Sequence, residues 1–126
     1  MKMIFQWQLP IYTVSEANSR EHWAKKAVRH DTQKRWIWAT FKAEKPVIPL
    51  PCHIKLTRIG KRYLDSDNLP TSMKYIRDAI ADQIFPGLAP GQADNDSRLS
   101  WEYDQTKGKE CEVIVTFYHD DTSYEL

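Results

Sequence analysis

The chain has 126 residues, 41% of them hydrophobic, and its 18 lysines and arginines are nearly balanced by 17 aspartates and glutamates. This length favours one domain, and no apolar run approaches the roughly 20 residues of a membrane-spanning helix. The amino terminus lacks the pattern of a signal peptide, and the two cysteines lack the spacing of a zinc site. We therefore expect a cytoplasmic protein without a membrane partner.

The first half of the chain is predicted to form a strand, a long helix and a second strand. Apolar and polar residues alternate from Met3 to Leu9, which is the period of a half-buried strand. Asn18 followed by Glu21 resembles a capping box, so a helix is expected to begin there and to continue to about Glu44. A second strand is predicted from the alternating apolar residues that follow, Cys52, Ile54 and Leu56.

The second half is predicted to form one helix and a hairpin. Apolar residues at spacings of three and four indicate a helix from Pro70 to about Phe85. Two alternating segments, 99–103 and 111–117, flank the turn QTKGK and predict a hairpin. We expect an α+β fold in the order β-α-β-α-β-β, with a mixed sheet of about four strands and two helices. Residues 1–118 would form the single domain, and 119–126 a polar acidic tail.

Charge is divided unevenly along the chain, although the net charge is only +1. Between Arg20 and Arg62 there are twelve lysines and arginines against three acids, whereas from Tyr63 to Leu126 there are five against thirteen. A local positive field captures polyanions regardless of the net charge, so this division favours a nucleic-acid partner. The alternative is a segregation of solvated side chains without a binding role.

Acidic residues are gathered before the second predicted helix and again before the third strand. Asp65 and Asp67 would point the same way in an extended segment, where two carboxylates suit a hard divalent cation. Asp94 and Asp96 repeat this spacing and offer further ligands. Such crowding raises carboxylate pKa values unless a cation neutralises it. As an alternative, Asp and Asn before a helix are ordinary caps and turn formers.

Other activities lack the residues that they need. The segments beginning at Asp65 and Asp94 have no glycine at the sixth place and no glutamate at the twelfth place of an EF-hand loop. A glycine-rich phosphate loop is also missing, so no nucleotide cofactor is expected, and neither a nucleophile elbow nor an HExxH motif occurs. The four histidines are scattered and are interpreted as surface residues.

Basic side chains near the acids are candidates for binding a phosphate backbone. Three of them lead directly into Asp65 and are the favoured contacts: Arg58, Lys61 and Arg62. A second group forms a stripe on the first predicted helix: Lys25, Lys26 and Arg29. Lys74 and Asp78 have the i, i+4 spacing, which fits either a surface salt bridge or a lysine that holds a phosphate.

These motifs occur in the same order in a known family. A resemblance to the RusA-type Holliday-junction resolvases is carried by two segments, DSDNLPTSMKYIRDAIAD and DNDSRLSW. The upstream segment NSREHWAKKAVRHDTQKRW is similar to the basic amino-terminal helix of that family, so the resemblance spans about residues 18–101. It implies a Mg²⁺-dependent homodimer, with Mn²⁺ as the alternative ion, that resolves four-way DNA junctions by paired incisions.

The resemblance also implies roles for individual residues. Asp65, Asp67 and Asp96 match the metal-binding catalytic acids, and Lys74 matches the essential lysine. Further candidates for this site are Asp94, Asp78 and Asn68. The family's lysine follows the second aspartate by four residues, a place that Thr71 holds here. Lys74 is matched to it because Lys74 precedes Asp78 by four residues, the same spacing that the family's lysine has to an aspartate of its helix.

Two other functions and the mode of assembly stay open at this stage. The chain fits a noncatalytic DNA-binding module, in which the acids only cap a helix, and a metal-dependent nuclease that acts on other branched DNA. Paired incisions require two sites, so a homodimer is expected. Its interface is predicted on the apolar face of 3–9 or along an exposed sheet edge.

Overall fold

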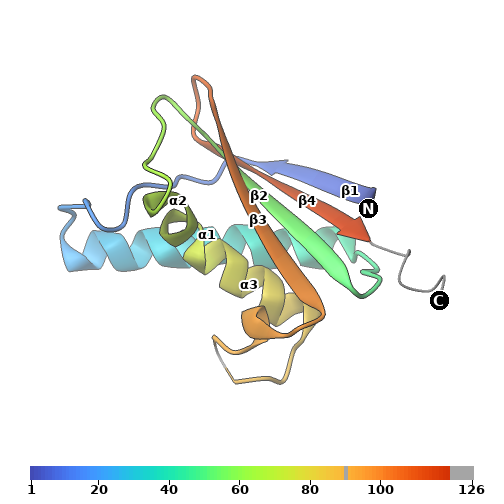
Figure 1. Cartoon of the computed structure of the whole chain (residues 1–126). Helices are drawn as coiled ribbons and strands as arrows, with labels where there is room; N and C mark the ends of the chain where they lie inside the picture. Colours follow the sequence, from blue (N-terminus) through green and yellow to red (C-terminus); the bar gives the residue numbers. More distant parts are fainter. Residues whose placement is uncertain (90, 120–126) are drawn as a thin grey trace.

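Four strands and three α-helices make up the fold of the computed structural model, which describes residues 1–89 and 91–119 (Figure 1). The α+β class with a four-stranded mixed sheet is confirmed. None of the described helices is long and apolar enough to cross a membrane. Residues 120–126 of the predicted acidic tail lie outside the described ranges. In chain order the elements are β1 (Lys2–Leu9), α1 (Trp23–Glu44), β2 (Cys52–Gly60), α2 (Asn68–Ser72), α3 (Lys74–Ile84), a 3₁₀ turn η1 (Ala93–Asn95), β3 (Leu99–Lys107) and β4 (Glu112–His119).

The strands are ordered β1-β4-β2-β3, so the predicted hairpin between the last two strands is wrong. β3 pairs in parallel with β2, while β4 lies between β1 and β2 and is antiparallel to both. The chain therefore crosses the end of β2 after β3. Gly108 lies at this crossing: its N–H donates to the Gly60 carbonyl oxygen at 3.0 Å, and an added Cβ would be only 2.5 Å from Ile59 Cγ2.

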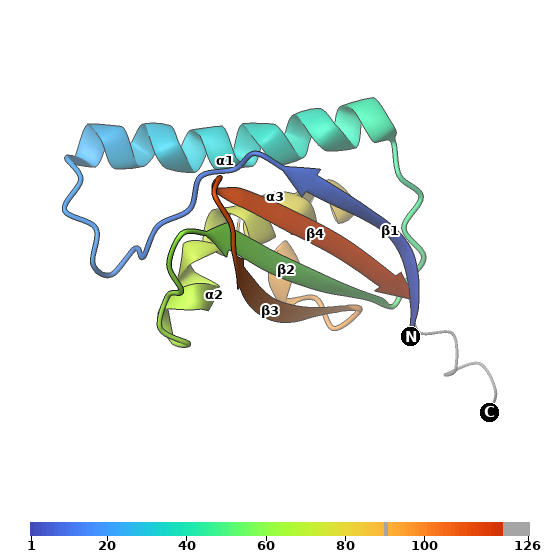
Figure 2. The same ribbon diagram turned by 90° about the horizontal axis from the view of Figure 1, so that it is seen from above.

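One face of the sheet carries the hydrophobic core. Alternate residues of β2 are buried on this face, as the alternation predicts. The buried stripe of α3, which includes Ile76 and Ile80, packs against it together with Ile37 and Phe41 of α1. Because both long helices contribute to one core, they lie on the same side of the sheet (Figure 2).

Part of the predicted apolar face of β1 packs on this core, whereas Met3, another residue of that predicted face, is exposed, so a dimer interface on this face stays a prediction. Phe5 stacks on Phe117 with ring centroids 4.4 Å apart, and Trp7 meets Phe41 at 5.1 Å. Phe5 and Trp7 are half-buried within one protomer. The other predicted interface, an exposed sheet edge, corresponds to β1 or β3.

A break at Met73 divides the second predicted helix into α2 and α3. Met73 has φ −104° and ψ 2°, and its side chain is fully buried. The Thr71 hydroxyl donates to the Asn68 carbonyl oxygen at 3.0 Å, and the Ser72 hydroxyl donates to the Leu69 carbonyl oxygen at 2.6 Å. Such side-chain bonds compete with the helical hydrogen bonds and bend a helix.

The first helix begins at Trp23, so the capping box predicted at Asn18 is wrong. His22 caps the helix, since its Nδ1 accepts a hydrogen bond from Ala24 N at 3.2 Å. Asn18 instead donates to Ser15. The helix ends where it was predicted to end, at Glu44, because the next residue takes a left-handed conformation.

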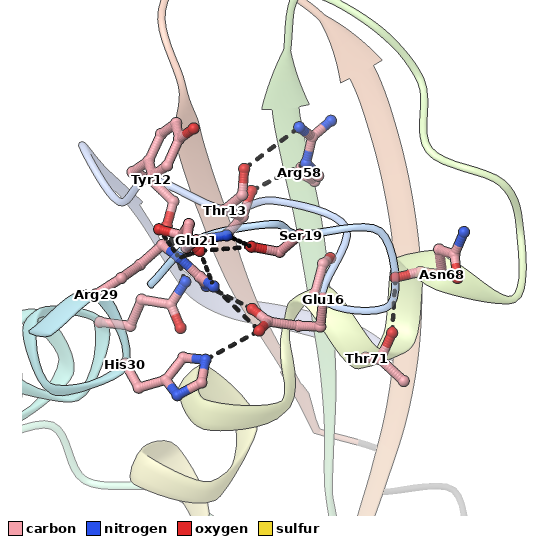
Figure 3. Close-up of polar contacts among 12 residues, drawn as sticks. Tyr12, Thr13, Glu16, Ser19, Glu21, Arg29, His30, Arg58, Asn68 and Thr71 are labelled. Carbon is pink, nitrogen blue, oxygen red and sulfur yellow. Dashed lines mark hydrogen bonds and ion pairs between the residues drawn. The ribbon is translucent and has the colours of Figure 1, made fainter. Parts of the chain in front are cut away.

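The loop of residues 10–22 is fastened to α1 by a cluster of charged side chains (Figure 3). Arg29 is only 7% exposed and forms ion pairs with both Glu16 and Glu21, and His30 lies 2.9 Å from Glu16. Hydrogen bonds from Arg29 lower the pKa of Glu21 to about 2. Burial would raise the pKa of Glu16, but hydrogen bonds from Arg29 and His30 outweigh it, and this pKa is also lowered. We call these four residues the Arg29 cluster.

The Arg29 cluster is expected to stabilise the fold most near neutral pH. A carboxylate with a lowered folded-state pKa contributes stability above its unfolded pKa of about 4.3, and this contribution is lost as the pH falls toward 2. Glu21→Gln should therefore reduce the free energy of unfolding at pH 7, and the difference from the wild type should shrink toward pH 2. Urea denaturation at a series of pH values measures this, with exposed Glu44→Gln as the control. A difference that does not change with pH would contradict the expectation.

Candidate functional site

The two aspartates before α2 lie in a turn, not in the extended segment that was predicted. The backbone oxygen of Asp65 accepts hydrogen bonds from Asn68 N at 2.9 Å and Leu69 N at 3.1 Å. Asp67 holds the N-cap position of α2 with φ −79° and ψ −20°, but its side chain makes no capping hydrogen bond. The Asp67 carboxylate therefore does not cap the helix, contrary to the alternative interpretation of these acids.

The carboxylates of this acidic turn, Asp65 and Asp67, are exposed to solvent. Within residues 1–89 and 91–119, no hydrogen bond or ion pair joins either carboxylate to another side chain. Mg²⁺ in proteins is commonly held by one or two carboxylates, with waters and substrate phosphates completing its shell. The acidic turn therefore has the chemistry of a partial magnesium site that a substrate would complete.

Asp96, the third predicted metal ligand, is not brought to the acidic turn. Leu64, beside Asp65, exchanges two hydrogen bonds with Gln105 at 2.9 and 2.8 Å. Asp96 precedes Leu99 at the other end of β3, and the strand between Gln105 and Leu99 spans roughly 20 Å at about 3.3 Å per residue. Among the described residues, no group of three His, Cys, Asp or Glu side chains is placed to hold a metal ion.

Asp96 is instead engaged by a neighbouring arginine. Arg98 contacts its carboxylate through Nη2 at 2.9 Å, Nε at 3.0 Å and the backbone N at 2.9 Å. These hydrogen bonds lower the pKa of Asp96 to about 2. The negative charge of Asp96 is therefore balanced within the protomer, unlike the charges of the acidic turn.

A hollow of about 210 Å³ is lined by residues of α2, α3, η1 and β3. Arg77 is fixed in it by Asp94, whose Oδ2 is 3.0 Å from Nε, and by the Tyr103 hydroxyl at 2.8 Å. Thr71 and Lys74, the two candidates for the position of the family's lysine, line the same hollow.

Asp78 and Asn68, two further candidates, have different surroundings. A salt bridge between Lys74 and Asp78, one of the two interpretations of their spacing, does not form in the described part of the chain. Burial, followed by the nearby charge of Asp94, raises the pKa of Asp78. Asn68 opens α2, and its backbone oxygen accepts the hydrogen bond from Thr71 (Figure 3).

Arg58 and Arg29 were predicted to contact DNA, but the structure buries both. Arg58 is 7% exposed and donates to Thr13 Oγ1 at 2.9 Å (Figure 3). It also donates to the Arg62 carbonyl oxygen at 2.9 Å. Arg29 is held in its own cluster. Their guanidinium groups are held by protein acceptors, so they position loops, and their contact with DNA stays a prediction. Of the other predicted contacts, Lys26 is half-buried, and three are exposed: Lys25, Lys61 and Arg62.

The end of β3 and its connection to β4 add two lysines to this region. One depression of about 550 Å³ is lined by Lys61, Arg62 and Lys109, and an adjoining one of about 630 Å³ is lined by Lys61, Lys107 and Lys109. We call these four residues the basic groove. Leu64, which precedes Asp65 in the chain, lines the depression of about 550 Å³. Sequence reasoning missed Lys107 and Lys109 because a turn pattern does not reveal which loop the turn will lie against.

Comparison of the chain with protein-family models, with curated proteins and with solved structures gives no match. The fold and the site define a small α+β protein in which a basic groove adjoins an acidic turn. The resemblance to RusA-type resolvases thus rests on the order of the motifs in the sequence.

Asp78→Asn is expected to stabilise the protein at pH 7. A carboxyl whose folded-state pKa is raised costs stability when ionised, and this cost disappears as the pH falls below its unfolded pKa of about 3.9. The gain should therefore be present at pH 7 and vanish near pH 3, as measured by thermal unfolding. Asp104→Asn, at an exposed residue 3.4 Å from Lys55, should give no such gain. A less stable Asp78→Asn protein at pH 7 would refute the electrostatic assignment.

Proposed function

We propose that the protein is a metal-dependent endonuclease that resolves four-way DNA junctions. One observation carries the proposal: Asp65 and Asp67, exposed and without a side-chain hydrogen bond or ion pair in the described part of the chain, follow Lys61 and Arg62 within one loop. A nuclease needs these two features side by side, because the substrate is a polyanion and the scissile phosphate needs local charge neutralisation. The order of motifs shared with RusA-type resolvases supports the same function.

Each group would have a distinct task in the reaction. Mg²⁺ or Mn²⁺ held by Asp65 and Asp67 would supply an activated water and neutralise the charge that grows on the phosphate. Lys61 and Arg62 would hold the backbone beside that phosphate. Lys74, exposed at the start of α3, would offer a further positive charge from the neighbouring hollow.

The proposed metal site can be drawn with or without Asp96 as a ligand. The resemblance assigns it to the metal, whereas in this structure it is paired with Arg98 at the far end of β3. Because Mg²⁺ retains several waters, the acidic turn and a substrate phosphate provide enough ligands without it. We therefore assign the ion to Asp65 and Asp67 in a single protomer.

A noncatalytic DNA-binding module is the second candidate. It is favoured by the separation of Asp96 from the acidic turn, which leaves no described group of three acids at one point. Such a module would bind junctions and leave them intact in Mg²⁺. A nuclease for other branched DNA would cleave flaps and forks as well as four-way junctions.

The central test is the substitution Asp67→Asn. We expect cleavage of a labelled four-way junction in Mg²⁺ to fall by about 10²-fold or more, because a ligand that stabilises the transition state is lost. Binding of the junction in EDTA should persist. Asp31→Asn, at an exposed residue on α1, is the matched control and should cleave normally. Full activity of Asp67→Asn would exclude the proposed site.

The same cleavage assay tests whether Asp96 is a ligand of the metal ion. If the acidic turn alone holds the ion, Asp96→Asn should lose less than about tenfold of the cleavage rate. A loss as large as that of Asp67→Asn would show that Asp96 reaches the ion through a rearrangement or from a second copy.

Paired incisions require two active sites, so we propose that the protein acts as a homodimer. Light scattering at micromolar concentration should give about twice the chain mass of 14.8 kDa. Heterodimers of the wild type and Asp67→Asn should nick one strand without resolving the junction. A monomer that still makes paired cuts would refute the dimer and leave the metal chemistry in place.

A further inference from the structure

Two loops from distant parts of the chain form the walls of the basic groove. The first follows β2 and carries Lys61 and Arg62, and the second begins at Lys107, the last residue of β3, and carries Lys109. The Gly108 N–H donates to the Gly60 carbonyl oxygen at 3.0 Å, which ties the loops together at their bases. The two pairs of cations are therefore held on one surface.

The cations of the groove are available to a ligand. Within the described ranges, no ion pair engages the side chains of Lys61, Arg62 or Lys109, and the Lys107 ammonium lies 5.0 Å from the centroid of the Tyr63 ring. Glu110 is the acidic residue that lines both depressions. Four cations against one lining acid give the groove a net positive field, which complements a phosphate backbone.

The floor of the groove is rigid. Arg58 lies beneath it and binds both Thr13 of the 10–22 loop and the backbone oxygen of Arg62. Leu64, at the end nearest the acidic turn, is held by two hydrogen bonds to Gln105 of β3. A surface fixed in this way loses little conformational entropy when it binds a ligand.

We propose that Lys107 and Lys109 bind the phosphodiester backbone of DNA in this groove and lead one strand toward the acidic turn. The ligand identity rests on the proposed nuclease function, whereas the groove itself is defined by the charges and contacts above. These lysines contact phosphates, not bases, so their contribution is the same for any DNA sequence.

The double variant Lys107→Ala/Lys109→Ala tests the proposal. Binding of a labelled four-way junction and of a linear duplex is measured in EDTA, where no cleavage occurs, over a series of salt concentrations. Loss of two phosphate contacts should reduce the slope of log K against log salt by about 1.8 and weaken binding to both DNAs. Lys107→Arg/Lys109→Arg keeps both charges and should retain most of the wild-type slope.

The matched control is Lys42→Ala/Lys45→Ala, which removes two exposed lysines at the carboxyl end of α1, away from the groove. Its salt slope should equal that of the wild type. An unchanged slope in Lys107→Ala/Lys109→Ala, with circular dichroism showing a folded protein, would overturn the assignment, as would an equal loss in the control.

The outcomes for the groove and for the nuclease are separable. A wild-type protein that binds DNA with a slope dependent on Lys107 and Lys109, but never cleaves, would support the groove and refute the nuclease. A wild-type protein that cleaves junctions, together with a Lys107→Ala/Lys109→Ala variant that keeps the wild-type salt slope, would support the nuclease and refute the groove. Failure of the wild type to bind either DNA would overturn both proposals.

Discussion

The buried guanidinium of Arg58 is the contact on which the arrangement of the site depends. A guanidinium carries five N–H donors and cannot be deprotonated in the protein, so burial is tolerated only when acceptors surround it. Thr13 and the Arg62 carbonyl oxygen provide them. Gly60 is required beside it, since an added Cβ would be 2.7 Å from Arg58 Nη1. One side chain thus joins the end of β2, the 10–22 loop and the loop that leads to Asp65.

Local patterns in the sequence predict the elements of this fold well and their partners poorly. Alternation along 52–60 and 111–117 correctly indicates strands, because burial of one face depends only on residue type along the strand. It carries no information about which strand lies alongside. β4 enters between β1 and β2 because the chain crosses at Gly108, and this crossing depends on space beside Ile59 that is visible only in three dimensions.

The same distinction applies to the charged residues. The division of charge along the chain correctly indicates a basic surface next to Asp65, and Lys61 and Arg62 are exposed there. The charge pattern does not indicate that Arg29 and Arg58 are buried, because their burial depends on acceptors 8 to 45 residues away in sequence. The convergence of carboxylates is likewise a property of strand register, and parallel pairing of β2 with β3 sets the acids that follow one strand and precede the other at opposite ends.

Arg58 and the lysines occupy different levels of the groove, and their chemistry explains why. Arg58 is buried, where a planar group with several donors satisfies more than one acceptor at once. Lys61, Lys107 and Lys109 line the surface beside Arg62, where a flexible ammonium adapts to a phosphate without fixed geometry. A buried Arg58 beneath exposed cations suits a ligand whose charge repeats regularly while its sequence varies, because the floor fixes the path of the backbone and the rim adjusts to each phosphate.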